Sequence, residues 1–300
     1  MSSRQLPIGR HPIRRPRVGH IEFLNCLPLS WGLGRIGSHL RLQLTVASPD
    51  RLSESLVTGQ LDISPISAFE FLRHASDLIA LSGIAIGCDG PVMSCLIIST
   101  VPLEDLGGAT VALGSTSRTS VQLARLLLRD VIGVSCHYVT WAPDLESMLR
   151  VGSAAVIIGD SALRAADAAI RRGYFVYDLG QMWRDWTGLP FVFAVFAVRR
   201  SYLDCNAEIV DSVHNDLLAA RDLALAEIDE ICREVAMWDA VDETTLRQYY
   251  TSALDFSFDQ RQRQGLIEFA HRVAGAEAGF AADLPFDVVE SALPEPTDLR

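Results

Sequence analysis

Short apolar segments alternate with amphipathic segments along most of the chain. In the first third, strand-like runs are separated by helix-like stretches with apolar residues on one face. The predicted strands cover 18–24, 40–46, 61–66 and 91–100, and the predicted helices cover 28–35, 49–59 and 68–74. Alternation of strand and helix predicts parallel strands covered by helices, which is an α/β fold.

The same pattern repeats further along the chain. Strands are predicted over 110–113, 137–141 and 154–158, and helices over 119–130, 145–151 and after Asp160. A strand over 191–198 then leads into a helix-rich C-terminal region with predicted helices over 207–236, 243–250 and 260–274. Two such series predict two lobes, each a mostly parallel sheet flanked by helices.

The apolar runs over 91–100 and 191–198 bracket the second series. We therefore expect the chain to cross between lobes there, so that lobe 1 comprises 17–99 plus 199–300 and lobe 2 comprises 100–198. In open α/β sheets, ligands bind at the carboxyl ends of strands. The ligand site is expected in the cleft between the lobes.

Composition agrees with a globular protein and limits its partners. Of the 300 residues, 49% are apolar and 21% are charged, which is typical of a soluble domain. The apolar runs are far shorter than the roughly 20 residues of a membrane helix, so no membrane is expected as a partner. Residues 1–16 are basic without the apolar stretch of a secretion signal, and we expect a disordered arm and a cytoplasmic location.

The cationic residues exclude several kinds of chemistry. All 26 are arginine, so neither a Schiff-base lysine nor the lysine of a phosphate-binding Walker loop is available. The net charge is −11, and no dense basic cluster follows residue 17, which argues against nucleic acid as a partner. The sequence does not predict an oligomeric state.

No cofactor or metal is expected from the motifs. Gly32, Gly34 and Gly37 match a G-x-G-x-x-G pattern, but only Ser38 and His39 separate Gly37 from the strand predicted over 40–46. These glycines therefore end a helix instead of opening one, unlike those of a dinucleotide site. The cysteines and histidines show no metal-ligand spacing, and the cysteines are expected to be buried thiols.

The strongest chemical signal is a run of hydroxyl residues between a strand and an amphipathic helix. Five of six consecutive positions carry a hydroxyl in the segment Ser115, Thr116, Ser117, Arg118, Thr119 and Ser120. Helix amino-termini favour anions through free amides and the helix dipole. Simple capping requires one such residue, so we expect the run to bind a carboxylate.

Several other polar residues lie at strand-to-helix junctions, where capping and ligand binding are both possible. Asn25 offers a donor and an acceptor to a ligand, or it caps the first helix. Ser67 either contacts a ligand or begins the next helix. Asp160 either caps a helix or acts as a catalytic acid, and we expect Gly159 and Asp160 to lie at the substrate site. Ser94 lies in an apolar strand, where a buried hydroxyl needs a partner.

Together the segments VGHIEFLNCLPLSWGL, LDISPISAFEFL, GCDGPVMSC, LGSTSRTSVQLARLLL, IGDSAL and WTGLPFVFAVFA resemble the chorismate dehydratases of the futalosine route to menaquinone. The resemblance covers roughly 17–286. It implies a type II periplasmic-binding-protein-like fold and the elimination of water from chorismate to give 3-[(1-carboxyvinyl)oxy]benzoate. By resemblance, Asn25 and Ser94 contact the substrate at the reacting centre, and the segment 115–120 holds a carboxylate of this small dianion.

Three functions remain open: this dehydratase, the 1,4-dihydroxy-6-naphthoate synthase of the same pathway and fold, and a non-catalytic receptor for a small carboxylate. For the dehydratase, Asn25 and Ser94 offer no strong base. We therefore predict that the enolpyruvyl carboxylate of the substrate removes the proton. His20, Glu22 and Asp160 are the rival bases.

Overall fold

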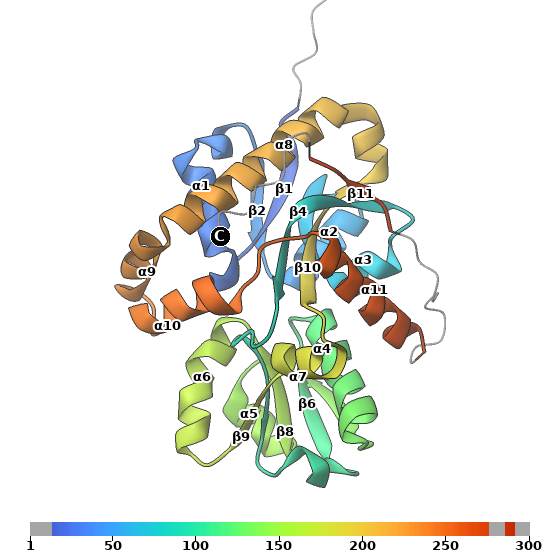
Figure 1. The fold of residues 1–300 in the computed structure, drawn as a ribbon, viewed down its shortest axis with the longest axis vertical. Coiled ribbons are helices and arrows are strands. Elements are labelled where there is room, and N and C mark those ends of the chain that lie inside the picture. The colour runs from blue at the N-terminus through green and yellow to red at the C-terminus, as the bar shows by residue number, and fades with distance from the viewer. Residues whose placement is uncertain (1–13, 276–285, 292–300) are drawn as a thin grey trace, which may run out of the picture.

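The computed structural model describes residues 14–275 and 286–291. Most of the basic arm expected over 1–16 lies outside the described residues. The molecule has two lobes, each built on one sheet (Figure 1). The α/β class and the two-lobed architecture predicted from the sequence are therefore confirmed.

The first lobe contains a six-stranded sheet with the order β11-β4-β10-β3-β1-β2. Its strands are β1 (Arg17–Ile21), β2 (Gln43–Ala47), β3 (Ile63–Ser67), β4 (Leu78–Cys88), β10 (Phe191–Arg199) and β11 (Val288–Val289). β1 pairs in parallel with β2 and β3, whereas β10 runs antiparallel to both β3 and β4. The sheet is therefore mixed, because β10 enters it from the opposite end.

Helices α1 (Leu27–Arg35), α2 (Pro49–Val57) and α3 (Ala68–Arg73) connect or follow the parallel strands of this sheet. The sequence analysis missed β4. Its residues LIALSGIAIGC are interrupted by Ser82 and Gly83, and the ladder with β10 contains two register shifts. At one of these shifts, residues 81–84 of β4 lie opposite Phe196 alone, and such an irregularity breaks the regular pattern on which strand prediction depends.

The second lobe contains a five-stranded sheet with the order β7-β6-β8-β5-β9. Its strands are β5 (Cys95–Ser99), β6 (Thr110–Gly114), β7 (His137–Trp141), β8 (Ala154–Ile158) and β9 (Phe175–Asp178). Its helices are α4 (Arg118–Leu126), α5 (Leu145–Val151), α6 (Asp160–Arg171) and α7 (Leu179–Thr187). Here β5 runs antiparallel to β8 and β9, so this sheet is also mixed.

The C-terminal region is mainly helical and covers the first lobe (Figure 1). It comprises α8 (Arg200–Ala226), α9 (Ile228–Ala236), α10 (Glu243–Gln248) and α11 (Gln260–Ala274), with a π-helical turn over Tyr249–Ala253. The single helix predicted over 207–236 is two helices separated at Glu227. The Glu227 carboxylate accepts hydrogen bonds from the Trp31 indole and the Arg35 guanidinium of α1.

The remaining short elements are 3-10 turns over Leu24–Cys26, Ser38–Leu40 and Leu103–Leu106, and a second π-helical turn over Leu127–Ile132, which directly extends α4. The first of these turns joins β1 to α1. It therefore places Asn25 at the junction between a strand and a helix, as the sequence pattern predicts.

The sheets to which β5 and β10 belong place the crossings between lobes earlier in the chain than the sequence analysis expected. β5 belongs to the second sheet and β10 to the first, so the chain crosses over 89–94 and again over 188–190. The boundaries expected at Ser99 and Arg199 each fall one strand later than this. The apolar runs were predicted as strands, but the sequence of a fully buried strand does not show which sheet it joins.

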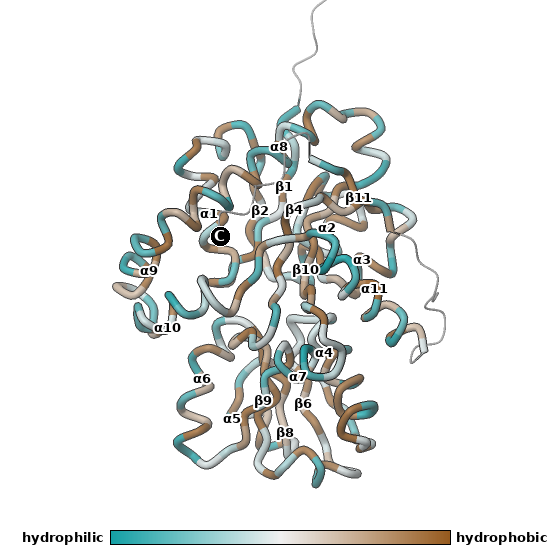
Figure 2. The backbone as a smooth tube through the Cα atoms, viewed as in Figure 1, coloured by the Kyte–Doolittle hydropathy of each residue, from teal (hydrophilic) through white to brown (hydrophobic). Residues whose placement is uncertain are grey.

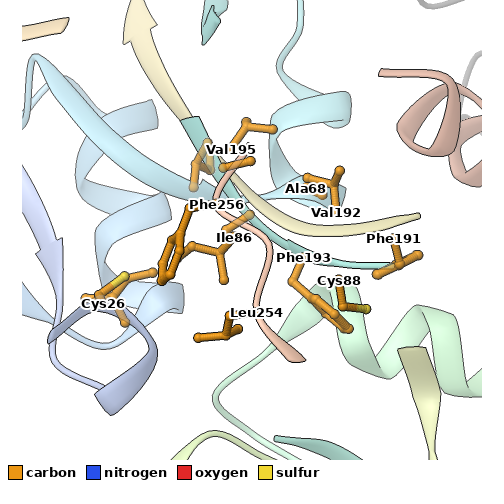
Figure 3. Packing of buried hydrophobic residues seen from close by; sticks show 14 of the residues in the cluster. Cys26, Ala68, Ile86, Cys88, Phe191, Val192, Phe193, Val195, Leu254 and Phe256 are labelled. Atoms are coloured by element: carbon orange, nitrogen blue, oxygen red, sulfur yellow. The ribbon is translucent and has the colours of Figure 1, made fainter. Parts of the chain in front are cut away.

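The core lies mainly along the central strands of the two sheets, which include hydrophobic segments of the backbone (Figure 2). β10 is buried over its whole apolar length. Figure 3 shows part of this core, in which Phe191 pairs with Cys88 of β4 and packs against Phe193 at a ring separation of 4.7 Å. Within the described part of the chain, no helix has the length and apolar character needed to cross a membrane.

Candidate functional site

A small cavity lies where the two lobes meet, and both contribute to its wall. Its lining comprises Ile21, Phe23, Asn25, Pro49, Ser67, Ile86, Val92, Ser94, Cys95, Ser117, Ser120, Ile158, Gly159, Phe193, Ala194 and Leu254. The space inside is about 50 Å³. Pockets for drug-sized ligands hold roughly 300–1,000 Å³, so a ligand of that size requires the lobes to separate or side chains to move.

Helix beginnings surround the cavity. Asn25 precedes α1, Pro49 begins α2, Ser117 precedes α4 and Gly159 precedes α6. The free amides at a helix start carry partial positive charge. None of the described residues that line the cavity is an acid, an arginine or a histidine. The local potential therefore favours an anion without a cationic side chain in the wall.

Asn25 does not cap a helix. The N-cap of α1 is Cys26, and no side chain caps the preceding turn. The Asn25 Oδ1 atom is buried and has no hydrogen-bond partner among the residues that the structure describes. A buried carbonyl oxygen without a partner costs free energy, and a donor supplied by a ligand would remove that cost.

The backbone before Asn25 is fixed from both sides. The Leu24 amide donates to Oδ1 of Asp160 at 2.9 Å, and the Tyr250 hydroxyl donates to the Leu24 carbonyl oxygen at 3.0 Å. Asp160 belongs to the second lobe, so the first of these bonds also crosses the cleft. Asp160 itself does not line the cavity.

Ser94 lies in the segment that crosses between the sheets, and it is 3% exposed. Its Oγ accepts a hydrogen bond from the Tyr249 hydroxyl at 2.9 Å, and its carbonyl oxygen accepts one from the Gly159 amide at 2.7 Å. The preceding residue, Met93, has a φ of +64°, which is unusual for a residue with a side chain. Ser94 is thus held by two independent hydrogen bonds, one to its side chain and one to its backbone.

The residues of the segment 115–120 have different roles. Ser117 and Ser120 line the cavity, and the Ser117 hydroxyl also caps α4 by accepting from the Ser120 amide at 3.2 Å. The Thr119 hydroxyl instead accepts from the Phe69 amide of the other lobe at 3.1 Å. Arg118 pairs with Glu70 at 3.1 Å. Ser115 and Thr116 do not line the cavity.

Ser67 and Gly159 both line the cavity and also have structural roles. The Ser67 hydroxyl caps α3 by accepting from the Glu70 amide at 3.3 Å while facing the cavity. Gly159 has a φ of +63°, and a Cβ there would lie 3.2 Å from the Phe23 ring. Only glycine meets both conditions without strain.

Comparison with known proteins identifies the family. The family model described as "Menaquinone biosynthesis" matches residues 16–275, which is most of the chain. This chain belongs to the menaquinone biosynthesis family. Among its relatives is the chorismate dehydratase of Thermus thermophilus, 30% identical over 85% of this chain and 94% of that protein. A 1,4-dihydroxy-6-naphtoate synthase of the same organism is 26% identical over 84% of this chain and 90% of that protein.

The fold of this menaquinone biosynthesis family member is that of type II periplasmic binding proteins. The alkanesulfonate-binding protein of Xanthomonas axonopodis pv. citri, solved with bound MOPS, superimposes with a TM-score of 0.64 at 14% identity. The match covers 92% of this chain and 98% of that protein. The fold expected from the sequence resemblance is therefore confirmed.

The candidate bases of this family member lie outside the cavity wall. Burial lowers the pKa of His20 to about 4, so its imidazole is neutral near pH 7. Burial also raises the pKa of Asp160, whereas Glu22 is exposed. The Cys95 thiol does line the cavity, but burial raises its pKa to about 12, which keeps it protonated.

Sequence reasoning missed several residues of the site. Phe23 and Phe193 form apolar walls, and Tyr249 and Asp178 hold the segment around Ser94. Asp178 is followed by Gln181, a spacing typical of a capping box, and this signal predicts the missed helix α7. Contacts over more than 80 positions, such as those of Asp178 with Val92 and Met93, leave no such local signal.

Proposed function

We propose that this protein is a chorismate dehydratase that converts chorismate to 3-[(1-carboxyvinyl)oxy]benzoate. The observation that carries the proposal is the chemistry of the cavity. Within the described part of the chain, the buried Oδ1 of Asn25 has no partner, the Ser94 hydroxyl is fixed, and the cavity wall contains no strong base. The relative with 30% identity is a chorismate dehydratase, which supports the same reaction.

The reaction breaks the C3–H and C4–O bonds of the substrate ring and forms a C3=C4 double bond. The ring becomes aromatic, and the proton and hydroxide leave as water. Because no lining side chain is a strong base, the enolpyruvyl carboxylate of the substrate takes the C3 proton. Well-oriented groups within one molecule reach effective concentrations of about 10⁵ M or more, so such a carboxylate can replace a protein base.

Asn25 and Ser94 orient the substrate in this mechanism. The Asn25 oxygen accepts a hydrogen bond from a substrate hydroxyl, and the Ser94 hydroxyl donates one to a substrate oxygen. A donor aimed at the departing C4 oxygen stabilises the charge that develops there. Both residues are neutral, so they contact the dianionic substrate without adding charge to the cavity.

The carboxylates of chorismate require donors. The amides at the start of α4, with the hydroxyls of Ser117 and Ser120, form the proposed carboxylate cradle. Because the enclosed space is about 50 Å³, the substrate must enter an opened form of the protein. Closure then excludes water from the reaction.

The second candidate is the naphthoate synthase reaction, which the 26% identity over 84% of the chain favours. A receptor for a small carboxylate is the third. One assay separates them: purified protein is incubated with chorismate, and an aromatic product lighter by one water is sought by absorbance and mass spectrometry.

Conversion of chorismate supports the dehydratase. Binding of chorismate without conversion indicates a receptor, and absence of both contradicts the dehydratase and leaves the synthase. The Ser94→Ala variant is the matched control, since it removes one hydroxyl from the proposed reacting centre. Product formed at the wild-type rate by this variant would indicate a contaminating activity or a different site.

A further inference from the structure

Two consecutive tyrosines reach the proposed reacting centre from the C-terminal helices. Tyr249 and Tyr250 are 0% and 1% exposed, and their rings lie 5.5 Å apart. They begin the π-helical turn Tyr249–Ala253, which follows α10 directly. Wide turns of this kind occur often at functional sites, where they change the direction of side chains within a helix.

Each tyrosine hydroxyl contacts a residue of the cavity or its immediate neighbour. Tyr249 donates to Oγ of Ser94, and Tyr250 donates to the carbonyl oxygen of Leu24, next to Asn25. Tyr249 itself does not line the cavity. Its contact with the substrate would therefore be indirect, through Ser94.

We propose that Tyr249 is a positioning residue for the elimination, because its hydroxyl occupies an acceptor site of Ser94 and leaves the Ser94 proton free for the substrate. This inference rests on the proposed dehydratase function. A serine hydroxyl has one proton and two acceptor sites. A donor that fills one acceptor site therefore restricts the direction of the proton without consuming it.

The phenol is suited to act only as a donor to Ser94. Complete burial raises the pKa of Tyr249 well above its usual value, so the phenol stays protonated over the working pH range. A buried phenol also needs a partner for its hydrogen, and Ser94 is the one that the structure provides.

Among the described residues, the Ser94 hydroxyl has a weak acceptor in the Cys95 thiol and no stronger one. The Cys95 thiol lies beside Ser94, and it already receives a hydrogen bond from the Ser120 hydroxyl at 3.5 Å. Sulfur is a weak acceptor. A substrate oxygen in the cavity is therefore the better acceptor, and the Tyr249–Ser94 bond prepares Ser94 to donate to it.

The backbone around Ser94 is fixed independently of Tyr249. The Ser94 carbonyl oxygen accepts from the Gly159 amide, and Met93 is held by Asp178. Loss of the Tyr249 hydroxyl therefore changes the rotation of the Ser94 hydroxyl while the position of its Oγ is retained. This separates the inference from a general structural role.

A double-mutant cycle tests this role, with single-turnover rates measured at excess enzyme so that slow variants remain measurable. Tyr249→Phe is expected to lower the rate roughly 10- to 100-fold while the KM for chorismate changes less than about twofold. If Tyr249 acts through Ser94, the double variant Tyr249→Phe/Ser94→Ala has the same rate as Ser94→Ala alone. If the rate loss of the double variant is instead the product of the two single losses, the positioning role is wrong.

Tyr250→Phe is the matched control, because it removes one hydroxyl from an equally buried neighbour whose partner is Leu24. Its effect is expected to multiply with that of Ser94→Ala, since it does not act through Ser94. Thermal melting of each variant checks that folding is retained. If Tyr249→Phe does not fold, site-specific incorporation of 3-fluorotyrosine at position 249 alone keeps the hydroxyl and strengthens its donation to Ser94.

In that second measurement, the rate is expected to change in the wild-type background and not in Ser94→Ala. An equal change in both backgrounds would overturn the inference. Wild-type protein that fails to convert chorismate would overturn the proposed function, and the positioning role with it. Wild-type protein that converts chorismate while the losses multiply would leave the function intact and remove only the role of Tyr249.

Discussion

The carboxylate of Asp178 accepts the backbone amide of Met93 at 2.7 Å, across 85 positions of sequence. The same carboxylate accepts from the Val92 amide at 3.0 Å and caps α7 through the amides of Gly180 and Gln181. Met93 has a left-handed backbone, which a residue with a side chain adopts only when its surroundings impose it. Asp178 thus supports the strained residue that directly precedes Ser94.

Replacing Asp178 should therefore affect both stability and the site. We expect Asp178→Ala to lower the free energy of unfolding by about 2 to 4 kcal/mol, because a helix cap and the acceptor for two inward-facing amides are lost. Urea denaturation measures this. Asp144→Ala is the control, since Asp144 caps α5 at an exposed site away from the cavity, and its loss is expected near 1 kcal/mol. Equal losses of stability in the two variants would contradict the role of Asp178 as acceptor for the Val92 and Met93 amides.

The pKa of Asp178 also predicts a dependence on pH. Burial is the largest cause of its shift and raises the pKa above the usual value of 3.8, so the folded state holds the proton more tightly than the unfolded state. The stability that this group contributes is present below pH 3.8 and is lost as pH rises through its folded pKa.

The free energy of unfolding of the wild type, relative to Asp178→Asn, should therefore fall as pH rises above about 4. Asparagine keeps an acceptor at this position and does not titrate. Denaturation of both proteins over a pH series measures the difference. A difference that grows with pH would show that hydrogen bonds to the carboxylate outweigh its burial.

The carboxylate cradle at α4 can be tested by removing one amide. Arg118 is the first residue of α4, where proline is well tolerated, and Ser117 has an extended backbone that suits a following proline. Arg118→Pro should weaken binding of chorismate by about 1 to 3 kcal/mol relative to Arg118→Ala. Both variants lose the ion pair with Glu70, so calorimetric Kd values compare the amide alone. Equal Kd values would place the carboxylate elsewhere.

The identity of the base is tested by neutral replacements. Glu22→Gln and Asp160→Asn are expected to retain turnover, because neither carboxylate lines the cavity. Asn25→Ala and Ser94→Ala are expected to lower kcat about 10²- to 10⁴-fold, since they remove groups that contact the reacting atoms. Steady-state assays with chorismate measure all four. If Asp160→Asn abolishes turnover and leaves binding intact, substrate assistance is wrong and Asp160 is the base.

Lobe closure should accompany binding. In the structure the lobes are joined by the bonds from Leu24 to Asp160 and from Phe69 to Thr119, and by the ion pair between Arg164 and Asp239. The small cavity requires the lobes to separate or side chains to move before a substrate enters, and we expect these contacts between the lobes to open. Small-angle scattering should give a smaller radius of gyration with a product analogue than without it, and an unchanged radius would count against closure.

Sequence patterns predicted much of the fold because its strands and helices alternate regularly. The junctions at Asn25, Ser67 and Ser117 were located from short motifs, and the structure brings all three to one cavity. β4 was missed because Ser82 and Gly83 interrupt its pattern at an irregular part of the ladder, and the break between α8 and α9 depends on a distant contact of Glu227.

The parts of the site that sequence could not predict are contacts between distant segments. Thr119 is indistinguishable from Ser120 in the hydroxyl run, yet one binds the Phe69 amide and the other lines the cavity. The difference arises from helix periodicity combined with the approach of α3, which is fixed only when the lobes pack together.

The position of β10 has a consequence for synthesis on the ribosome. This strand lies between β3 and β4, although it follows the whole second sheet in the chain. During translation all five strands of the second sheet emerge before Phe191–Arg199, so the second lobe can fold while β3 and β4 still present unpaired edges. Such edges promote association between chains. A nascent chain stalled between α7 and β10 therefore exposes both edges, and we expect it to associate more readily than the complete chain.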